Sequence, residues 1–396
     1  MPARLFILGG SVLQLPAILE AKRMGLEVGV ADMNPNAVGV AYADAFFPVS
    51  TTDIGGVISA VEQFGADGIM TLATDMPMRT IARVCERFPS LNGIDYTTAL
   101  RCTDKLQMIE AFHTHGVPAP WYVIVDSLTL NCFCTDDITY PCISKPVDAS
   151  GSRGVCFIKT PEDLPAAVKY SLKHSQEGKV ILEEYLEGDE VSVETITIHG
   201  ETHIIAVTDK IVTGAPFFVE MGHSQPSRFQ STHGSEIKRV ASEAIKAVGI
   251  VDGPSHVEMK KTSNGFKMIE IGARLGGDCI TSHLVPLSTG ISMVRAVIDI
   301  ALGDTPDLTI KSHKGSAIRY IPHQCFGILQ DVCGVTEASD IPGIESIVIN
   351  KTAGDYIGEI RCSNDRLGFV ISCADSSSSA ISTCEEALSL IYYTVK

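Results

Sequence analysis

The chain has 396 residues, of which 45% are hydrophobic and 20% charged, and its formal net charge is −16 at pH 7. This length is too great for one hydrophobic core and predicts two or three domains. The acidic balance argues against nucleic acid as a partner, because basic side chains that neutralise phosphates supply most of that affinity. No window approaches the ~18 unbroken apolar residues of a membrane span, so no membrane-integral protein is expected.

Strands and helices alternate over the first hundred residues. The sequence predicts strands at 4–10, 26–32 and 66–75, and helices at 13–25 and 54–65. Strands separated by helices of this length form a parallel sheet with right-handed crossovers. This part is therefore expected to be Rossmann-like, and its first apolar run is typical of a strand rather than of a secretion signal.

A dinucleotide site is one interpretation of the first strand-to-helix turn. Gly9 and Gly10 follow the first strand and Asp32 ends the second, near the spacing of a ribose-binding acid. The two glycines are adjacent, however, and Gln14 and Leu15 stand where later glycines of that motif belong. A tight turn that holds part of a substrate is favoured over a nicotinamide site.

From about residue 100 the pattern changes. A helix capped by Thr103 or Asp104 ends at Gly116, before prolines that mark a boundary. The sequence then predicts a strand, a glycine-rich loop and a second strand at 140–158, followed by two strands at 179–200 that are interrupted at 187–190. After these we expect an antiparallel strand at 201–214, a helix at 235–250 and a hairpin at 255–278. Those expected last are strands at 315–321, 346–351 and 366–374, a serine turn at 374–380 and a helix at 382–395.

The loop between the strands of 140–158 is rich in small residues, which let backbone N–H groups converge on a phosphate. A flexible hairpin is the alternative on the loop alone. Lys145 lies in the apolar strand just before the loop and needs an anionic partner, for which phosphate oxygens are the natural candidate. Lys105, taken alone, is typical of a solvated surface charge.

The interrupted strand pair contains Glu183 to Leu186 and then Glu190. Backbone at such a turn can pair with the edge of a purine, and a following carboxylate can accept from ribose hydroxyls. Taken alone, the segment is also typical of an acidic surface hairpin.

The hairpin at 255–278 has two plausible registers. A two-residue turn at Asn264-Gly265 puts Glu258 and Glu270 on opposite faces. Hydrophobic patterning favours instead a three-residue loop, Ser263–Gly265, with these pairs: Glu258 with Glu270, Val257 with Ile271 and Met259 with Ile269. Like charges side by side need a cation, and oxygen ligands suit Mg²⁺. Two solvent-facing acids are the alternative.

Glu270 and Arg274 stand in a largely apolar stretch with no opposite charge next to either. Burying an unpaired charge is costly, so each is expected to have a partner from elsewhere, either a side chain or a ligand. Gly276 and Gly277 would let a substrate approach the backbone closely.

These motifs follow one another along the chain in a fixed order: Lys145 with its loop, the turn at 183–190, Glu258, and 270–278. In this order and spacing they resemble the ATP-grasp superfamily of carboxylate–amine ligases, and "ARLGGD" is most similar to L-amino acid (dipeptide) ligases. The resemblance implies an α/β (α+β) ATP-grasp fold. It divides the chain into a Rossmann-like pre-ATP-grasp domain at 1–100, an ATP-grasp domain at 101–310 with a small lobe at about 120–187, and a C-terminal β-rich subdomain at 311–396.

The resemblance also implies a role for each candidate residue. The ATP-binding set is Lys105 and Lys145 on the phosphates, Ser150, Gly151, Ser152 and Gly154 in the loop over them, Glu183, Glu184, Tyr185 and Leu186 at the adenine, and Glu190 at the ribose. The metal ligands are Glu258 and Glu270. The catalytic or substrate-facing set is Lys210, His223, Arg274, Gly276, Gly277 and Asp278.

The implied reaction has two steps, phosphorylation of a carboxylate by ATP and displacement of the phosphate by an amine. Mg²⁺, or Mn²⁺ in its place, and the lysines offset charge on the phosphoryl group, while Arg274 steadies the carboxylate-derived oxygens. His223 is expected either to orient or deprotonate the amine or to be a surface histidine. Gly272 departs from the asparagine of many members, so one magnesium would have fewer protein ligands and more water.

Other members of the superfamily carry motifs that this chain lacks, such as "RxQVEH" in biotin carboxylases and "PRPH" in purine-pathway enzymes. A purine-pathway or carbamoyl-phosphate-type ligase is the alternative within the superfamily, and a nucleotide-binding regulator or a dehydrogenase outside it. Twelve scattered cysteines without C-x-x-C predict reduced thiols in the cytoplasm. The expected partners are a small carboxylate and an amine, with no nucleic acid or membrane, and a homodimer as the common default.

Overall fold

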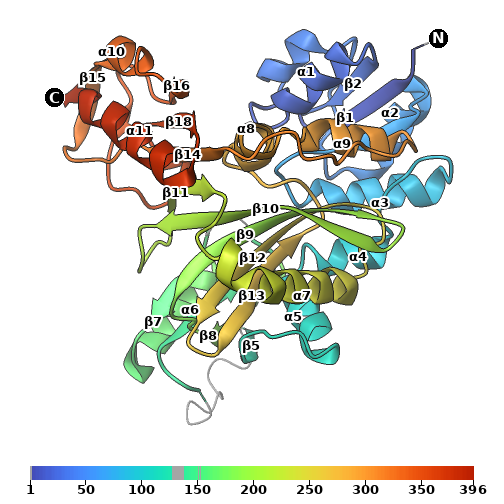
Figure 1. The fold of residues 1–396 in the computed structure, drawn as a ribbon. Coiled ribbons are helices and arrows are strands. Elements are labelled where there is room, and N and C mark those ends of the chain that lie inside the picture. Colours follow the sequence, from blue (N-terminus) through green and yellow to red (C-terminus); the bar gives the residue numbers. More distant parts are fainter. Residues whose placement is uncertain (1, 127–137, 150, 152) are drawn as a thin grey trace.

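The computed structural model describes residues 2–126, 138–149, 151 and 153–396 (Figure 1). Its N-terminal part, blue in Figure 1, is a four-stranded parallel sheet in the order β3-β2-β1-β4, which confirms the parallel sheet predicted from the alternating pattern. The elements are β1 (Arg4–Leu8), α1 (Leu15–Arg23), β2 (Glu27–Ala31), η1 (Val38–Tyr42), β3 (Ala45–Phe47), α2 (Ile54–Phe64), β4 (Gly68–Met70), α3 (Pro77–Arg87) and α4 (Tyr96–Arg101).

A second, antiparallel sheet has the order β5-β8-β6-β7. It follows α5, whose N-cap is Asp104, since that carboxylate accepts from the N–H of Gln107 at 2.9 Å. The elements are α5 (Lys105–Thr114), β5 (Tyr122–Asp126), β6 (Cys142–Pro146), β7 (Cys156–Ile158), η3 (Pro161–Asp163), α6 (Leu164–Leu172) and β8 (Lys179–Glu184).

The largest sheet has eight strands in the order β13-β12-β9-β10-β11-β14-β18-β16. Its elements are β9 (Asp189–Ile198), β10 (Glu201–Val212), β11 (Glu220–Gln225), α7 (Gln230–Val248), β12 (Gly253–Thr262), β13 (Gly265–Gly272), η4 (Ile280–Leu284), α8 (Val285–Thr289), α9 (Met293–Ala301), β14 (Gly315–Tyr320), β16 (Ile344–Ile349) and β18 (Gly368–Ala374). Because β14, β18 and β16 extend the same sheet, it crosses residue 311, where a domain boundary is expected. The boundaries themselves stay a prediction.

Helix α7 shows why the core lies where it does. Its buried residues recur at helical spacing, which gives the helix one apolar face: Ile237, Val240, Ala241, Ala244, Ile245, Ala247 and Val248. In Figure 1 the helix lies across β12 and β13, and these residues join the core cluster that contains buried side chains of both strands.

The last part of the chain corrects two expectations. It contains β15 (Gly327–Cys333), α10 (Val335–Ser339), β17 (Tyr356–Ile357), η5 (Ser363–Asp365), α11 (Ser377–Leu390) and β19 (Tyr392–Val395), with β17-β15-β19 as a small sheet. The predicted serine turn is instead the start of α11, because the Ser376 hydroxyl caps it by accepting from Ser379 N–H. The predicted final helix ends at Leu390, since the aromatic and β-branched residues of β19 pair with β15.

No single helix within the described ranges is long and apolar enough to cross a membrane. One bent pair, Ile280–Thr289 with Met293–Ala301, meets that test on length and composition only.

Gly188 fixes how the second sheet joins the largest one. It lies between β8 and β9 with φ at 140°, and a Cβ there would overlap the carbonyl oxygen of Lys261 on β12. Since L-residues avoid this backbone conformation and the oxygen belongs to the backbone of a paired strand, only glycine fits.

We expect Gly188→Ala to lower the free energy of unfolding by at least about 2 kcal/mol more than Gly178→Ala. Gly178 also has a positive φ, 69°, but a Cβ there meets no atom within 4 Å. Urea unfolding followed by the fluorescence of the single tryptophan, Trp121, measures both variants. Equal losses would show that the close approach to Lys261 has no energetic weight.

Candidate active site

A cavity lies between the second sheet and the β12–β13 hairpin, and most of the predicted ATP-binding residues line it. These are Lys105, Lys145, Gly151, Glu183, Glu184, Tyr185, Leu186 and Glu190, together with the predicted metal ligands Glu258 and Glu270. Gly154, which was also predicted to bind ATP, does not line the cavity. It packs closely against His174 and Pro146, which a Cβ at this position would meet. Ser150 and Ser152 lie outside the described residues.

Part of the lining of this cavity is apolar, which suits a flat base: Ile143, Val155, Phe218 and Met268. The Tyr185 ring contacts that of Phe157, with centroids 4.9 Å apart. Lys267 binds the Glu184 carboxylate at 2.7 Å. Two side chains of the segment at 183–186 are therefore held by contacts within the protein.

Two lysines of the cavity, Lys105 and Lys145, are paired with carboxylates of the protein. Lys145 contacts Glu183, so its partner within the chain is a carboxylate and not, as the sequence suggested, only a ligand phosphate. Lys105 is not a solvated surface charge, because its Nζ lies 2.9 Å from Glu270 and its side chain is 13% exposed. Burial lowers the pKa of Lys105, but the Glu270 carboxylate outweighs it and the net shift is upward.

Glu258 and Glu270 stand directly opposite one another on β12 and β13, as the predicted register requires. The pairing of Val257 with Ile271 is also confirmed. The predicted loop and the remaining pair are wrong: Thr262 pairs with Gly265 across Ser263 and Asn264, and Met259 pairs with Met268. A β-bulge after Glu258 absorbs the difference, so one extra residue on β13 restores the carboxylate pair.

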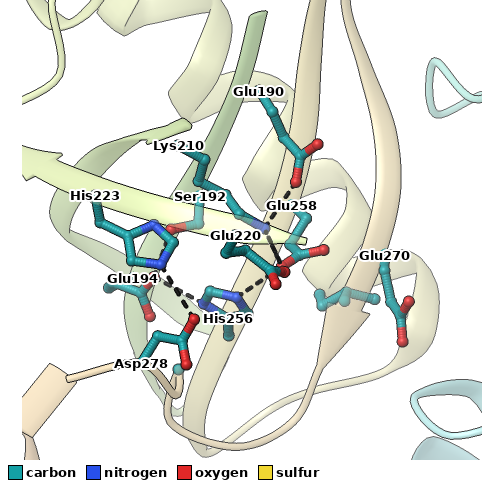
Figure 2. A network of polar contacts seen from close by, with 12 residues as sticks. Glu190, Ser192, Glu194, Lys210, Glu220, His223, His256, Glu258, Glu270 and Asp278 are labelled. Carbon is teal, nitrogen blue, oxygen red and sulfur yellow. Dashed lines mark hydrogen bonds and ion pairs between the residues drawn. The ribbon is translucent and has the colours of Figure 1, made fainter. Parts of the chain in front are cut away.

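Three cations compensate this pair of acids. Lys105 contacts Glu270, while Glu258 Oε1 accepts from Lys210 Nζ at 2.7 Å and lies 3.1 Å from His256 Nε2. Burial raises the pKa of Glu258, but the Lys210 ammonium and His256 outweigh it and hold that pKa well below its usual range. Figure 2 shows both contacts converging on Glu258, with Glu270 to one side.

The donor chemistry of Glu258 and Glu270 fits Mg²⁺, since both are ionised hard oxygen ligands at the edge of the cavity. No group of three or more His, Cys, Asp or Glu side chains in the described ranges is arranged to hold a metal by itself. A magnesium ion here would therefore need phosphate or water oxygens as further ligands.

Lys210, predicted to face the substrate, is almost completely enclosed, with a side chain 2% exposed. Its ammonium lies 2.7 Å from both Glu190 and Glu258, and 3.7 Å from Glu220. Burial lowers the pKa of Lys210, but these carboxylates outweigh it and raise it well above the usual value. The side chain is a fixed cation that links β9, β11 and β12.

Arg274 has a partner within the chain, which its sequence neighbours did not reveal. Its Nε and Nη2 bind Asp75 at 2.7 and 3.3 Å. Burial lowers the pKa of Arg274, but Asp75 outweighs it, so the net shift is upward. Of the two kinds of partner that the sequence left open for Arg274, a side chain or a ligand, the structure shows a side chain. A Cβ on Gly272 would lie 3.0 Å from Asp75 Oδ1, so glycine leaves room for this pair.

A second, larger cavity of about 760 Å³ opens on the far side of Glu258 and Glu270. Its walls come from the N-terminal sheet, from β10 to β13 and from η5. They include Ser11, Gln14, Asp32, Asp75, Lys210, Glu220, His223, His256, Arg274, Gly277, Asp278, Cys362, Ser363 and Asn364. Asp32 accepts from the N–H groups of Gly10 and Asn34, both at 2.8 Å, so its oxygens fix the first strand-to-helix turn.

His223 is a buried cavity residue rather than a surface histidine, at 1% exposure. Its Nε2 lies 3.4 Å from Asp278, and its Nδ1 is buried with no hydrogen-bond partner in the part of the chain that the structure describes. Asp278 is held in turn by two bonds of 2.8 Å from Arg366. Burial raises the pKa of Asp278, but His223 and Arg366 outweigh it and keep it far below its usual range.

Gly276 and Gly277 differ in what they face. Gly277 lines the larger cavity, whereas Gly276 does not. A Cβ on Gly276 would lie 2.7 Å from His256 Nδ1 and 2.9 Å from Glu194 Oε2. Packing inside the protein, not the approach of a substrate, accounts for glycine at this position.

Several residues of this site were not found from the sequence: Asp75, Glu194, Glu220, His256 and Arg366. The sequence held a usable signal for His256 and Glu194. His256 lies two residues before Glu258 on β12, and Glu194 lies two residues after Ser192 on β9. Residues two apart on a strand point to the same face of the sheet. Asp75 follows the last strand of a parallel sheet, where ligands commonly bind. Arg366 comes from a distant turn that no local pattern connects to the site.

Comparisons with known proteins agree with this geometry. A family model of the ATP-grasp domain matches residues 138–282, and one of the L-amino acid ligase C-terminal domain 2 matches residues 319–396. The alanine–anticapsin ligase of Bacillus subtilis is 28% identical over 299 residues, 69% of this chain and 62% of that protein. An L-arginine-specific L-amino acid ligase of Bacillus subtilis is 24% identical over 294 residues, 72% of this chain and 70% of that protein.

Among solved structures, an L-amino acid ligase from Bacillus licheniformis matches with a TM-score of 0.88 and 22% identity, over 100% of this chain and 99% of that one. That likeness, with the family match, establishes the ATP-grasp fold, in which the first cavity lies between the second sheet and the β12–β13 hairpin. The chain therefore contains an ATP-grasp domain and a C-terminal domain of the L-amino acid ligase family, and its homologues include ligases that act on amino acids.

Proposed function

We propose that the protein joins an amino acid, or a closely related carboxylic acid, to the amine of a second small molecule at the expense of ATP. The observation that carries this proposal is that the two cavities share the walls Glu220, Glu258 and Glu270. A nucleotide in the first cavity would present its terminal phosphate at the same carboxylates that border a substrate in the second.

The first cavity holds ATP, with its base against the apolar residues of the lining, such as Ile143 and Met268, and its phosphates toward Lys105 and Lys145. Glu258 and Glu270 hold Mg²⁺, which when bound neutralises phosphate charge and orients the transferring group. Each lysine then exchanges part of its contact with a protein carboxylate for a phosphate oxygen. Through this exchange, each of the two lysines has an anionic partner both when nucleotide is bound and when it is absent.

In the first step an oxygen of the substrate carboxylate attacks the γ-phosphorus of ATP, the bond to the bridging oxygen of ADP breaks, and an acyl phosphate forms. Arg274 lies in the larger cavity next to both metal ligands, where its guanidinium stabilises charge on the carboxylate-derived oxygens. Asp75 holds it in place through two bonds, so little reorganisation is needed when that charge develops.

In the second step the amine nitrogen attacks the acyl carbon, and inorganic phosphate leaves with the oxygen it received from the carboxylate. The amine must lose a proton in this step. His223 lines the cavity and has an unpartnered ring nitrogen, Nδ1, available to accept a hydrogen bond from the incoming amine. Asp278 contacts the other nitrogen and orients the ring.

The choice of an amino acid as carboxylate substrate rests on the relatives and on the cavity. Two relatives are named as ligases that act on alanine or arginine. Residues 319–396 match the C-terminal domain of the L-amino acid ligase family, and their turn at 362–364 lines the larger cavity. Both observations favour this substrate class over a purine-pathway or carbamoyl-phosphate-type ligase.

The purified protein, mixed with Mg-ATP and pools of amino acids and amines, is expected to release phosphate only when both a carboxylate and an amine are present. ADP should form with equal stoichiometry, and mass spectrometry should find a product lighter than its two substrates by one water. Release of AMP and pyrophosphate, or of phosphate without either pool, would contradict the proposed reaction.

Replacing Arg274 tests its role separately. We expect Arg274→Ala to lower turnover by about 10²-fold or more, because the developing charge loses its electrostatic partner, while ATP still binds within a few-fold of the native affinity. Calorimetric titration with ATP and a phosphate-release assay measure the two effects.

The matched control is Arg239→Ala, which removes an exposed arginine of α7 that pairs with Glu243. It should leave both turnover and ATP affinity unchanged. Unchanged turnover in Arg274→Ala, or loss of ATP binding in step with turnover, would sink the assignment.

A further inference from the structure

His256 bridges two carboxylates beside the hairpin that carries Glu258. Its Nδ1 lies 2.7 Å from Glu194 Oε1, and its Nε2 lies 3.1 Å from Glu258 Oε1. An ionised carboxylate only accepts hydrogen bonds, so both ring nitrogens donate when both acids are ionised. Figure 2 shows the ring lying between the two acids, with Lys210 reaching Glu258 from another side.

The far end of this bridge is fixed. Glu194 is completely buried on β9, and its Oε1 also accepts from the Ser192 hydroxyl at 2.9 Å. Its other oxygen, Oε2, is buried without a hydrogen-bond partner among the described residues. A buried carboxylate with an unpartnered oxygen is costly unless a nearby cation holds it, and His256 is the cation in contact.

The bridge also touches the loop that follows β13. The space in which a side chain of Gly276 would lie is occupied by His256 Nδ1 and Glu194 Oε2. Arg274 and Asp278, which lie two residues before and two residues after Gly276, both line the larger cavity. The course of this loop is therefore set against the same ring that orients Glu258.

Burial lowers the pKa of His256, but the carboxylates of Glu194 and Glu258 outweigh it and raise it to about 9. Both ring nitrogens of His256 lie within hydrogen-bond distance of protein carboxylates, which leaves neither of them to contact a substrate directly.

We propose that His256 is a positioning residue: anchored on Glu194, it fixes the direction of the Glu258 carboxylate as a metal ligand. With Lys210 and His256 both on Oε1, the second oxygen, Oε2, is the one left to bind the ion that accompanies ATP. This inference rests on the proposed function, in which Glu258 and Glu270 hold Mg²⁺ beside the nucleotide. In other metalloproteins, replacing a residue that orients a metal ligand in this way typically lowers the metal affinity by about 10–100-fold.

Two replacements of His256 separate its two contacts. In His256→Asn the amide nitrogen stands near the position of Nδ1 and keeps the anchor on Glu194, whereas in His256→Gln it stands near Nε2 and keeps the contact to Glu258. Binding of Mn²⁺ to the ADP-bound protein, followed by electron paramagnetic resonance, is the readout, so no turnover is needed. We expect His256→Asn to weaken Mn²⁺ binding by about 10-fold or more, and His256→Gln by clearly less.

Binding of ADP without metal and the thermal unfolding temperature serve as checks on the fold, and both should stay close to the native values in the two variants. His203→Gln, on β10 of the same sheet and outside both cavities, should leave Mn²⁺ binding unchanged. Native Mn²⁺ affinity in His256→Asn, equal weakening in the Asn and Gln variants, or loss of metal-free ADP binding in parallel would each overturn the positioning role.

The same data keep this inference distinct from the proposed function. If no carboxylate and amine are joined but His256→Asn still weakens Mn²⁺ binding selectively, the ligase proposal fails and the positioning role stands. If ligation occurs and the Mn²⁺ affinity is unchanged when His256 is replaced, only the positioning role fails.

Discussion

Two carboxylates held side by side, Glu258 and Glu270, are the constraint around which the rest of the site is arranged. Like charges opposite one another destabilise a hairpin, so the fold must bring cations to them. Lys105 comes from the start of α5, Lys210 from β10 and His256 from β12 itself. The charges of the pair are therefore compensated only when α5 and β10 have packed with the β12–β13 hairpin.

The same principle governs the charges around these acids. Lys145 with Glu183, Arg274 with Asp75 and Arg366 with Asp278 are joined within the chain before any ligand is present. Breaking such a pair without replacement would leave a buried charge uncompensated. In the proposed function, nucleotide, metal and substrate are accepted by exchange of partners. An acidic chain with a net charge of −16 would in this way hold a polyanion in a pocket of its own cations.

Sequence patterns predicted the parts of this architecture that depend on local rules. Alternation of strand and helix gave the parallel N-terminal sheet, and hydrophobic patterning placed Glu258 opposite Glu270. The turn of that hairpin was missed, because a β-bulge compensates for a shorter loop and no pattern in the sequence distinguishes the two. The partners of Arg274 and Asp278 were missed for another reason: Asp75 and Arg366 lie 199 and 88 residues away, and only the tertiary fold brings them close.

In the proposed reaction a carboxylate becomes an acyl phosphate in the cavity beside Glu258 and Glu270. A carboxylate substrate labelled with ¹⁸O in both oxygens tests this step most directly, by mass analysis of the phosphate released during amide formation. We expect one ¹⁸O atom in each phosphate and the other in the amide product. Amide formation with unlabelled phosphate, or with the label in AMP, would contradict it.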